Sequence, residues 1–313
     1  MSISKEIERL QQAKKDIGDA IVRKGGSVSG TIDTYANSIM ALGDVSFRTA
    51  IDIVNKSDAK NVDLTMISPK NETNLRELFY NNDKLVSVDI SNWDTSNITS
   101  LRTLFGTCPY LVSVDVSNWD TSNVTTFYAM LDACSNLKTF DTSKWDTSSA
   151  TNMAWMFNGV GLEELDVSNF NTSKVTNMYA MFSGVKAMVK LDVSNFDTSN
   201  VLDAGHMFSY WTNECEELNI SGLNLSNATS MDIPFYRTSF KVIRCEGLKL
   251  PNIDMSKIGL NYSTELTVDS IVGFLNALPQ SDKGYSFQIG SDNIAKLSDD
   301  QKAIATDKGW TLI

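Results

Sequence analysis

Six aspartates that recur at one position of an internal repeat are the residues of this sequence best placed to do chemistry. They are Asp63, Asp89, Asp115, Asp141, Asp166 and Asp192. Most of them stand between two apolar residues, as in Val114-Asp115-Val116, which is the alternation of a short strand. If such strands stack about 4.8 Å apart, the carboxylates form one column in which neighbours repel by about 1 kcal/mol even in water.

Two interpretations of this column are open. In the first, each carboxylate accepts backbone N–H bonds from the turn that follows it, or relaxes away from its neighbours. In the second, the column binds cations or a basic ligand. Calcium chelation is disfavoured, because a Ca²⁺ site needs about 6–8 converging oxygens rather than a column.

No other residues form a recognisable catalytic or cofactor site. His206 is the only histidine and stands at the repeat position that Ala180 fills elsewhere, which disfavours a Ser/His/Asp arrangement. The sequence has no C-x-x-C pair and no glycine-rich phosphate loop. The four cysteines are predicted to be buried apolar residues, with a disulfide between the stacked Cys108 and Cys134 as the alternative: Cys108, Cys134, Cys215 and Cys245. We therefore expect no enzymatic activity, no cofactor and no metal.

The aspartates belong to a repeat whose clearest copy is L-D-V-S-N-F-D-T-S-N-V, at residues 191–201. Its aromatic marker falls at Trp93, Trp119, Trp145, Phe170 and Phe196, in steps of 26, 26, 25 and 26 residues. A fixed period of this length is typical of a solenoid of stacked units. Alignment of the apolar positions gives eight strand positions, which continue from the six aspartates to Asn219 and Arg244.

Each unit is predicted to contain a parallel strand, a polar turn and a short helix. The S-N-W-D-T-S-N run is turn chemistry, and Met178, Met181 and Phe182 have the spacing of one helical face. The predicted fold class is an α/β solenoid of leucine-rich repeats, with a parallel sheet roughly 35 Å long. The aromatic markers are expected to fill the core, with an exposed sugar-stacking platform as the alternative.

The repeat wording L-x-x-L-D-V-S-N-F-D-T-S-N-V-T-x-M-x-x-M-F resembles the BspA-type leucine-rich-repeat family over residues 62–253. That family is found on bacterial surface proteins and in some phage proteins. The resemblance implies an interaction scaffold, often adhesive, without catalytic residues. Residues that vary beside the strand core are expected to contact a partner together with the aspartates, among them Glu164, Lys190 and Glu217.

Residues 1–43 are predicted to form a helical segment for attachment or oligomerisation. A heptad seam runs through Ile3, Ile7, Leu10, Ile17 and Ile21. A helical hairpin that caps the solenoid is the alternative. The pattern K-x-x-I-x-x-A-I-x-x-K-G, from Lys14 to Gly25, resembles the amino-terminal segment of many phage tail, fibre and other virion proteins. This resemblance implies docking to a virus particle.

Residues 44–265 are assigned to the solenoid, with residues 44–61 as a connection or first edge strand. Residues 266–313 are predicted to close it with a helix at 266–278, a strand at 286–289, a helix started by a Ser298–Gln301 capping box, and a last strand at 310–313. The stretch L-S-D-D-Q-K-A-I-A-T-D-K-G-W-T-L resembles a carboxyl-terminal segment common to phage and bacterial proteins that carry such repeats.

Charge and hydropathy narrow the partners. The net charge of −11 argues against nucleic acid or an anionic membrane as the main partner. The sequence shows neither an apolar run long enough to span a membrane nor a secretory signal, so we expect neither membrane insertion nor standard export. We expect a phage virion structural protein, made in the host cytoplasm, from a tail fibre, baseplate or head fibre with a receptor-binding solenoid. The expected partners are other virion proteins, a host surface protein or glycan, and further copies of the chain. The alternative is a bacterial surface adhesin or protein-interaction module.

Overall fold

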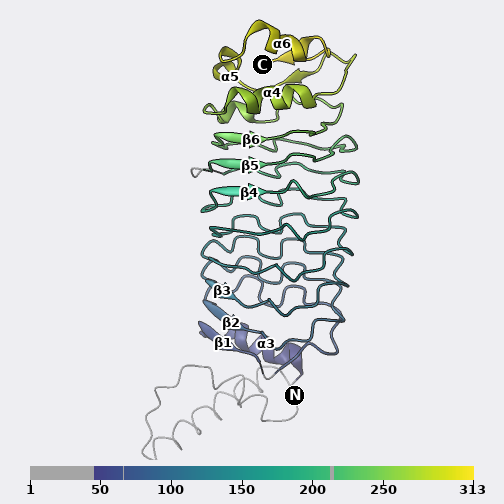
Figure 1. The fold of residues 1–313 in the computed structure, drawn as a ribbon. Helices are drawn as coiled ribbons and strands as arrows, with labels where there is room; N and C mark the ends of the chain where they lie inside the picture. Colours follow the sequence, from purple (N-terminus) through teal and green to yellow (C-terminus); the bar gives the residue numbers. More distant parts are fainter. Residues whose placement is uncertain (1–45, 66, 212–214) are drawn as a thin grey trace, which may run out of the picture.

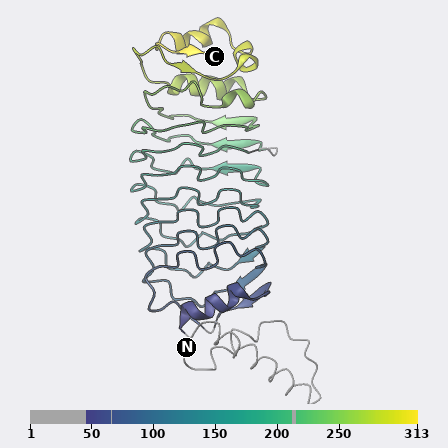
Figure 2. The ribbon, with the colours of Figure 1, turned by 180° about the vertical axis from the view of Figure 1, so that it is seen from behind.

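The repeat units of the chain lie on top of one another in a long stack, with helices at both ends (Figure 1, Figure 2). This computed structural model describes residues 46–65, 67–211 and 215–313. Helix α3 (Phe47–Lys56) lies at one end, and α4 (Val268–Ala277), α5 (Ser291–Ala295) and α6 (Asp299–Thr306) lie at the other. The predicted attachment segment, with Ile3, Ile7, Leu10, Ile17 and Ile21, lies outside the described residues.

Six short strands of the repeat region pair in parallel. They are β1 (Asn61–Asp63), β2 (Ser87–Asp89), β3 (Ser113–Val114), β4 (Lys190–Asp192), β5 (Glu217–Asn219) and β6 (Val242–Arg244). The first three form one sheet and the last three another. The inward residues are in register, so that Val62 lies opposite Val88 and Leu191 opposite Leu218. Six of the eight predicted strand positions are therefore confirmed.

The two strands predicted at Asp141 and Asp166 do not form. Of these segments, Thr139 makes one isolated bridge, to Ser113. Between the two positions, Gly161 approaches the preceding unit so closely that a Cβ would lie 2.3 Å from the carbonyl oxygen of Ser135. The step from Asp141 to Asp166 is 25 residues, but the step from Asn219 to Arg244 is also 25 residues and there β5 and β6 pair in register. The length of the step alone therefore does not explain the loss of these two strands.

A second ladder, here called the turn ladder, runs through the middle of the stack without interruption. One residue of each unit bridges in parallel to its equivalent in the next: Asn74, Ser100, Thr126, Asn152, Asn177, Asp203 and Ser230. The hydrogen bonds then continue along the following residues. The amides of Met178, Ala180 and Phe182, for example, donate to carbonyls of the next unit at 2.8–3.0 Å. The turn ladder thus holds the units together where the strand ladder lapses.

The short helix predicted in each unit is wrong. The segment after the turn ladder consists of successive β-turns, such as those closed by Met181 N to Met178 O and by Ser183 N to Ala180 O, each at 3.1 Å. Ala180 has a left-handed φ of 53° and Gly184 one of 66°. A helix would use every amide internally, whereas this geometry turns alternate amides toward the neighbouring unit. Met178, Met181 and Phe182 are buried as predicted.

The aromatic markers form the core. Trp93, Trp119, Trp145, Phe170 and Phe196 are each exposed by only 2–3%. The rings of Trp93 and Trp119 stack at 6.2 Å and those of Phe170 and Phe196 at 6.3 Å. The core prediction is confirmed, and the alternative of a sugar platform on these rings is wrong because no ligand can reach their faces.

The structure explains why the Asp-Thr-Ser motif recurs in the repeat. The buried hydroxyls of Thr95, Thr121 and Thr172 each donate to a carbonyl of the next unit, at 2.9–3.0 Å. The aspartate before each threonine holds the local turn, since Asp120 accepts from the amide of Ser122 at 3.0 Å. Each motif therefore closes its own turn and links its unit to the next.

Replacing a threonine of this ladder tests how much the link contributes. Thr121→Val keeps the volume but leaves the carbonyl of Asp146 without its donor, so we expect the free energy of unfolding to fall by about 1–3 kcal/mol. Urea denaturation measures the change. Thr121→Ser keeps the hydroxyl and should lose clearly less; equal losses for both variants would show that packing, not the hydrogen bond, matters.

The two ends of the stack differ in how well the sequence predicted them. Residues 47–56 form helix α3 rather than the predicted connection or strand. The side chain of Ser46 caps it by accepting from the amide of Thr49, and Ala50, Ile51 and Val54 are buried against the first units. At the other end, α4, α6, β7 (Ser286–Phe287) and its parallel partner β8 (Thr311–Leu312) confirm the predicted elements. The Ser298–Gln301 capping box is present.

Candidate binding surface

The outward residues of the eight strand positions, from 61–63 to 242–244, form a surface that we call the strand face. Each aspartate of the predicted column lies on it and accepts a hydrogen bond from the residue two positions further on. The donors are the amides of Thr65, Ser91, Ser117, Ser143, Ser168 and Ser194, at 2.9–3.1 Å. The first interpretation of the column, local capping of each turn, is thus confirmed.

In at least three of the aspartates these hydrogen bonds favour the charged form of the carboxyl group. The side chain and amide of Ser143 hold the pKa of Asp141 below its ordinary value of 3.8, and Ser168 does the same for the pKa of Asp166. For Asp115, the amide and side chain of Ser117 lower the pKa in the same way. At neutral pH the strand face therefore carries a row of ionised carboxylates.

These aspartates stabilise the fold through hydrogen bonds to their turns and destabilise it through repulsion between neighbouring carboxylates. The pH dependence of stability shows which of the two effects is larger. Because the pKa values of Asp115, Asp141 and Asp166 are lower in the folded chain than in the unfolded one, their stabilising contribution is present at neutral pH and is lost as pH falls below about 3.8 toward the lower folded pKa. We expect the Tm to change little between about pH 7 and 5 and to fall below about pH 4. Thermal unfolding followed by circular dichroism measures this. A Tm that rises on acidification would show that repulsion within the column dominates.

A hollow of about 1040 Å³ opens on the strand face where the two predicted strands are missing. It brings together four of the predicted binding residues: Asp141, Glu164, Asp166 and Lys190. The neighbouring Glu163 and Lys138 pair with each other at 3.2 Å, and Val189 contributes an apolar side chain that is 46% exposed. Four carboxylates against two ammonium groups leave the hollow negatively charged.

Three of the remaining aspartates, Asp63, Asp89 and Asp115, line a second hollow of about 390 Å³, and Asp192 lines neither hollow. The second hollow is separate from the larger one, since the lining residues do not overlap. The predicted binding residues are therefore on one face but are not gathered into a single site.

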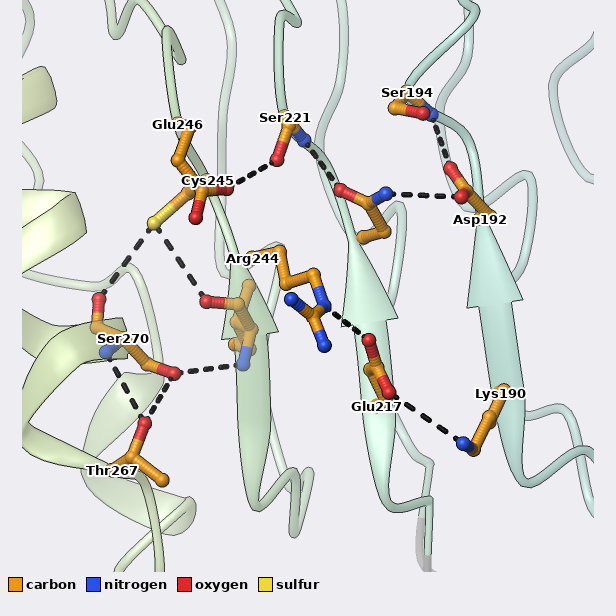
Figure 3. Close-up of polar contacts among 12 residues, drawn as sticks. Lys190, Asp192, Ser194, Glu217, Ser221, Arg244, Cys245, Glu246, Thr267 and Ser270 are labelled. Carbon is orange, nitrogen blue, oxygen red and sulfur yellow. Dashed lines mark hydrogen bonds and ion pairs between the residues drawn. The ribbon is translucent and has the colours of Figure 1, made fainter.

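Beyond Asp192 the column changes character, as Figure 3 shows. One carboxylate oxygen of Glu217 forms an ion pair with Arg244, and the other lies 3.6 Å from the ammonium group of Lys190. The hydrogen bond from Arg244, with the charges of Arg244 and Lys190, lowers the pKa of Glu217. Asn219 donates to Asp192 at 2.9 Å. Two of the predicted partner-contacting residues, Lys190 and Glu217, are thus already paired.

A second group of contacts joins this end of the face to the next unit and to α4. Ser221 donates to Glu246 at 2.7 Å, and the amide of Ile243 donates to Ser270 at 2.9 Å (Figure 3). A hollow of about 730 Å³ lies between β6 and α4. Arg244 and Glu246 were not among the predicted binding residues. Arg244 occupies the repeat position that aspartate fills in six earlier units, and this change of charge is the signal that identifies it.

This arrangement suits recognition by charge. In the described ranges, no three His, Cys, Asp or Glu side chains converge on a point that could hold a metal ion. The four cysteines are buried and unpaired, and burial raises the pKa of the Cys108 thiol to about 12. His206 lies away from the strand face, with its ring 5.2 Å from that of Tyr179. Among the described helices, none is long and apolar enough to cross a bilayer.

The repeat region also has known relatives at the level of a family. A family model described as "Mycoplasma protein of unknown function, DUF285" matches residues 73–162 and 140–243, which together make up more than half of the chain. The chain belongs to the DUF285 family. No curated protein and no solved structure matches it. The DUF285 matches cover the units that carry the turn ladder and the aspartates from Asp89 to Asp192.

Proposed function

We propose that this DUF285 chain is a non-enzymatic binding scaffold, a solenoid of the leucine-rich-repeat type whose strand face binds a macromolecular partner. The observation that carries the proposal is the open, acidic hollow around Glu164 and Asp166, in the middle of a stack held by two hydrogen-bonded ladders. A rigid surface loses little conformational freedom on binding, which favours affinity. Its charge favours a partner that presents Lys or Arg side chains.

For the setting, we propose a phage virion, in which the chain is a tail-fibre, baseplate or head-fibre protein that binds a host surface protein or glycan. The support is the resemblance of both terminal segments to those of virion proteins. In this setting residues 1–43 bind other virion proteins or further copies of the chain. The runner-up is a bacterial surface adhesin or interaction module, and the description of the DUF285 family as a Mycoplasma protein favours it.

The setting can be tested by location. Mass spectrometry of purified phage particles should detect the chain at a stoichiometry typical of a structural protein. Particles without it, together with antibody labelling of intact bacterial cells, would reject the virion setting in favour of the bacterial surface.

The binding face can be tested separately by photo-crosslinking. A photoreactive phenylalanine analogue placed at Glu164 should form a covalent adduct when the full chain is bound to its target cells. The same group at Lys283, an exposed residue near the carboxyl end, is the control. Adducts from Lys283 but not from Glu164 would reject the strand face as the binding surface.

A further inference from the structure

A second row of rings lies on the turn segments of the stack, away from the strand face. We call this row the aromatic row. Its members are Trp155, Tyr179, His206, Tyr210, Tyr236 and Tyr262. Successive ring centroids are 5.5, 5.2, 6.4, 5.4 and 5.0 Å apart. Unlike the core markers, these rings are half-buried or exposed, and Tyr210 and Tyr262 are exposed by 41% and 42%.

Three members of the row stand on unfavourable backbone. Trp155, His206 and Tyr210 have left-handed φ values of 61°, 55° and 61°. A residue with a side chain loses roughly 1–2 kcal/mol in this conformation. The same left-handed backbone recurs at the equivalent residues of other units, which carry side chains of every size: Ala129 and Ala180 beside Trp155, but Gly184 before and Arg237 after Tyr210. The left-handed turn thus belongs to the repeat itself, and because other units form it with alanine or glycine, the turn does not require a ring at these positions.

The surroundings of the row are shaped to hold its rings. The backbone of Gly205 is not left-handed, so its conformation does not require glycine. A Cβ at this position would lie only 3.1 Å from the ring of Tyr179, so glycine leaves room for that ring. The carboxylates of Asp203 and Asp232 lie close enough to influence both Tyr179 and His206. At the other end, the guanidinium group of Arg237 lies 5.3 Å from the ring centre of Tyr236. Apolar ring surface is thus flanked by side chains that can form hydrogen bonds.

The dimensions of the row favour a linear ligand. The row is one ring wide and about 20 Å long at the spacing of stacked strands. Its area is therefore far smaller than the roughly 800 Å² that each partner contributes to a standard protein interface. Two flanking carboxylates and the net charge of −11 disfavour a polyanion. Tyr and Trp offer an apolar face together with a polar edge, as sugar rings do.

We propose that the aromatic row binds a linear, uncharged polysaccharide, whose sugar rings pack on the side chains and whose hydroxyl groups bond to Asp203 and Asp232. This site goes beyond the proposed function, since it uses none of the residues of the strand face. A chain that binds a basic partner on one surface and a polysaccharide on another would engage a cell surface at two points.

Trp155 is a built-in reporter for this site. The other five tryptophans are exposed by only 1–3%, whereas Trp155 is half-buried, so acrylamide should quench mainly Trp155 fluorescence. Hydroxyethyl cellulose, laminarin and glycol chitin are suitable uncharged probes, and dextran sulfate is the anionic comparison. We expect at least one uncharged polymer, but not dextran sulfate, to protect Trp155 from quenching and to retard the chain in affinity electrophoresis.

The matched variants are Trp155→Ala and Tyr210→Gly, which introduce the residue types that neighbouring units use. Both should leave the Tm unchanged or raise it, while weakening retardation by about tenfold. Tyr110→Ala, which removes a tyrosine that is 56% exposed and outside the row, should bind normally. Reversal of the charges of Glu163 and Glu164 should also leave polysaccharide binding intact, and this separates the two proposed surfaces.

Three results would overturn the proposal. The first is the absence of retardation and protection with all three uncharged polymers. The second is retention of full binding by both row variants. The third is that no polymer binds but the two row variants lose binding to a protein partner. This result would identify the row as a protein interface.

Discussion

Phe182→Ala should lower the free energy of unfolding by about 3–5 kcal/mol, the largest effect expected of a single substitution here. Phe182 is fully buried in the middle of the stack, and its ring stacks on Phe157 at 5.7 Å and on Phe208 at 6.0 Å. Truncation leaves a cavity between two units that cannot collapse, because hydrogen bonds of the turn ladder fix the spacing of the backbones on both sides.

Urea denaturation followed by circular dichroism measures this change. The control is Leu202→Ala, which shortens an apolar side chain that is 49% exposed and should change the free energy by no more than about 0.5 kcal/mol. Similar small losses in both variants would mean that the ring column is not closely packed. A lower slope with denaturant for Phe182→Ala would show that the stack unfolds in two parts at the damaged unit.

Gly309→Ala should have the second largest effect. Gly309 has a φ of 83°, and a Cβ on it would lie 2.0 Å from the carbonyl oxygen of Ser281. The left-handed backbone costs roughly 1–2 kcal/mol, and displacement of the neighbouring backbone adds about 1–3 kcal/mol. We expect a total loss of about 2–5 kcal/mol, located in the unit that closes the carboxyl end.

Gly284→Ala is the matched control for this prediction. Gly284 belongs to the same closing unit and has a φ of 63°, but no atom lies within 4 Å of a Cβ built on it. This variant should therefore lose only the backbone contribution. If both variants lose the same amount of stability, crowding against Ser281 is not the cause, and the approach of the two segments is looser than the structure shows.

The sequence was sufficient to predict the features that recur in it. The period, the parallel register of Val62 with Val88, and the burial of Trp93 and its equivalents all follow from residue types that repeat. The closing elements were predicted because Thr267 and Ser298 are strong caps, and both of their side chains accept the expected amide hydrogen bonds. Local chemistry decided these elements.

Other features depend on contacts between units, which spacing alone does not reveal. Met178, Met181 and Phe182 have the spacing of a helix, yet their segment forms β-turns because the next unit accepts its alternate amides. Helix α3 was missed since its apolar residues lie in a single short stretch that repeats nowhere. The strands at Asp141 and Asp166 are missing although their repeat wording is intact, and a step of 25 residues does not account for this because β5 and β6 pair across a step of the same length.

The candidate binding residues show the same division. The aspartates were visible as a repeated type, and their positions on one face follow from the parallel strands. The aromatic row was missed because it moves between repeat positions: Tyr179, His206 and Tyr210 each occupy a different one. The available signal was a bulky residue at a position where the preceding unit carries alanine or glycine.

The central claim is that the strand face binds a partner, and equilibrium binding of the fluorescently labelled full chain to intact cells tests it most directly. The decisive comparison is between the unmodified chain, Glu163→Lys/Glu164→Lys in the hollow, and Asp83→Lys/Asp282→Lys, which makes the same charge change at exposed residues elsewhere. Across a panel of bacterial and animal cells that includes Mycoplasma, we predict saturable binding to at least one. The hollow variant should bind about tenfold more weakly there and the control normally. Equal binding of the unmodified chain and the hollow variant, or no saturable binding to any cell, would contradict the claim.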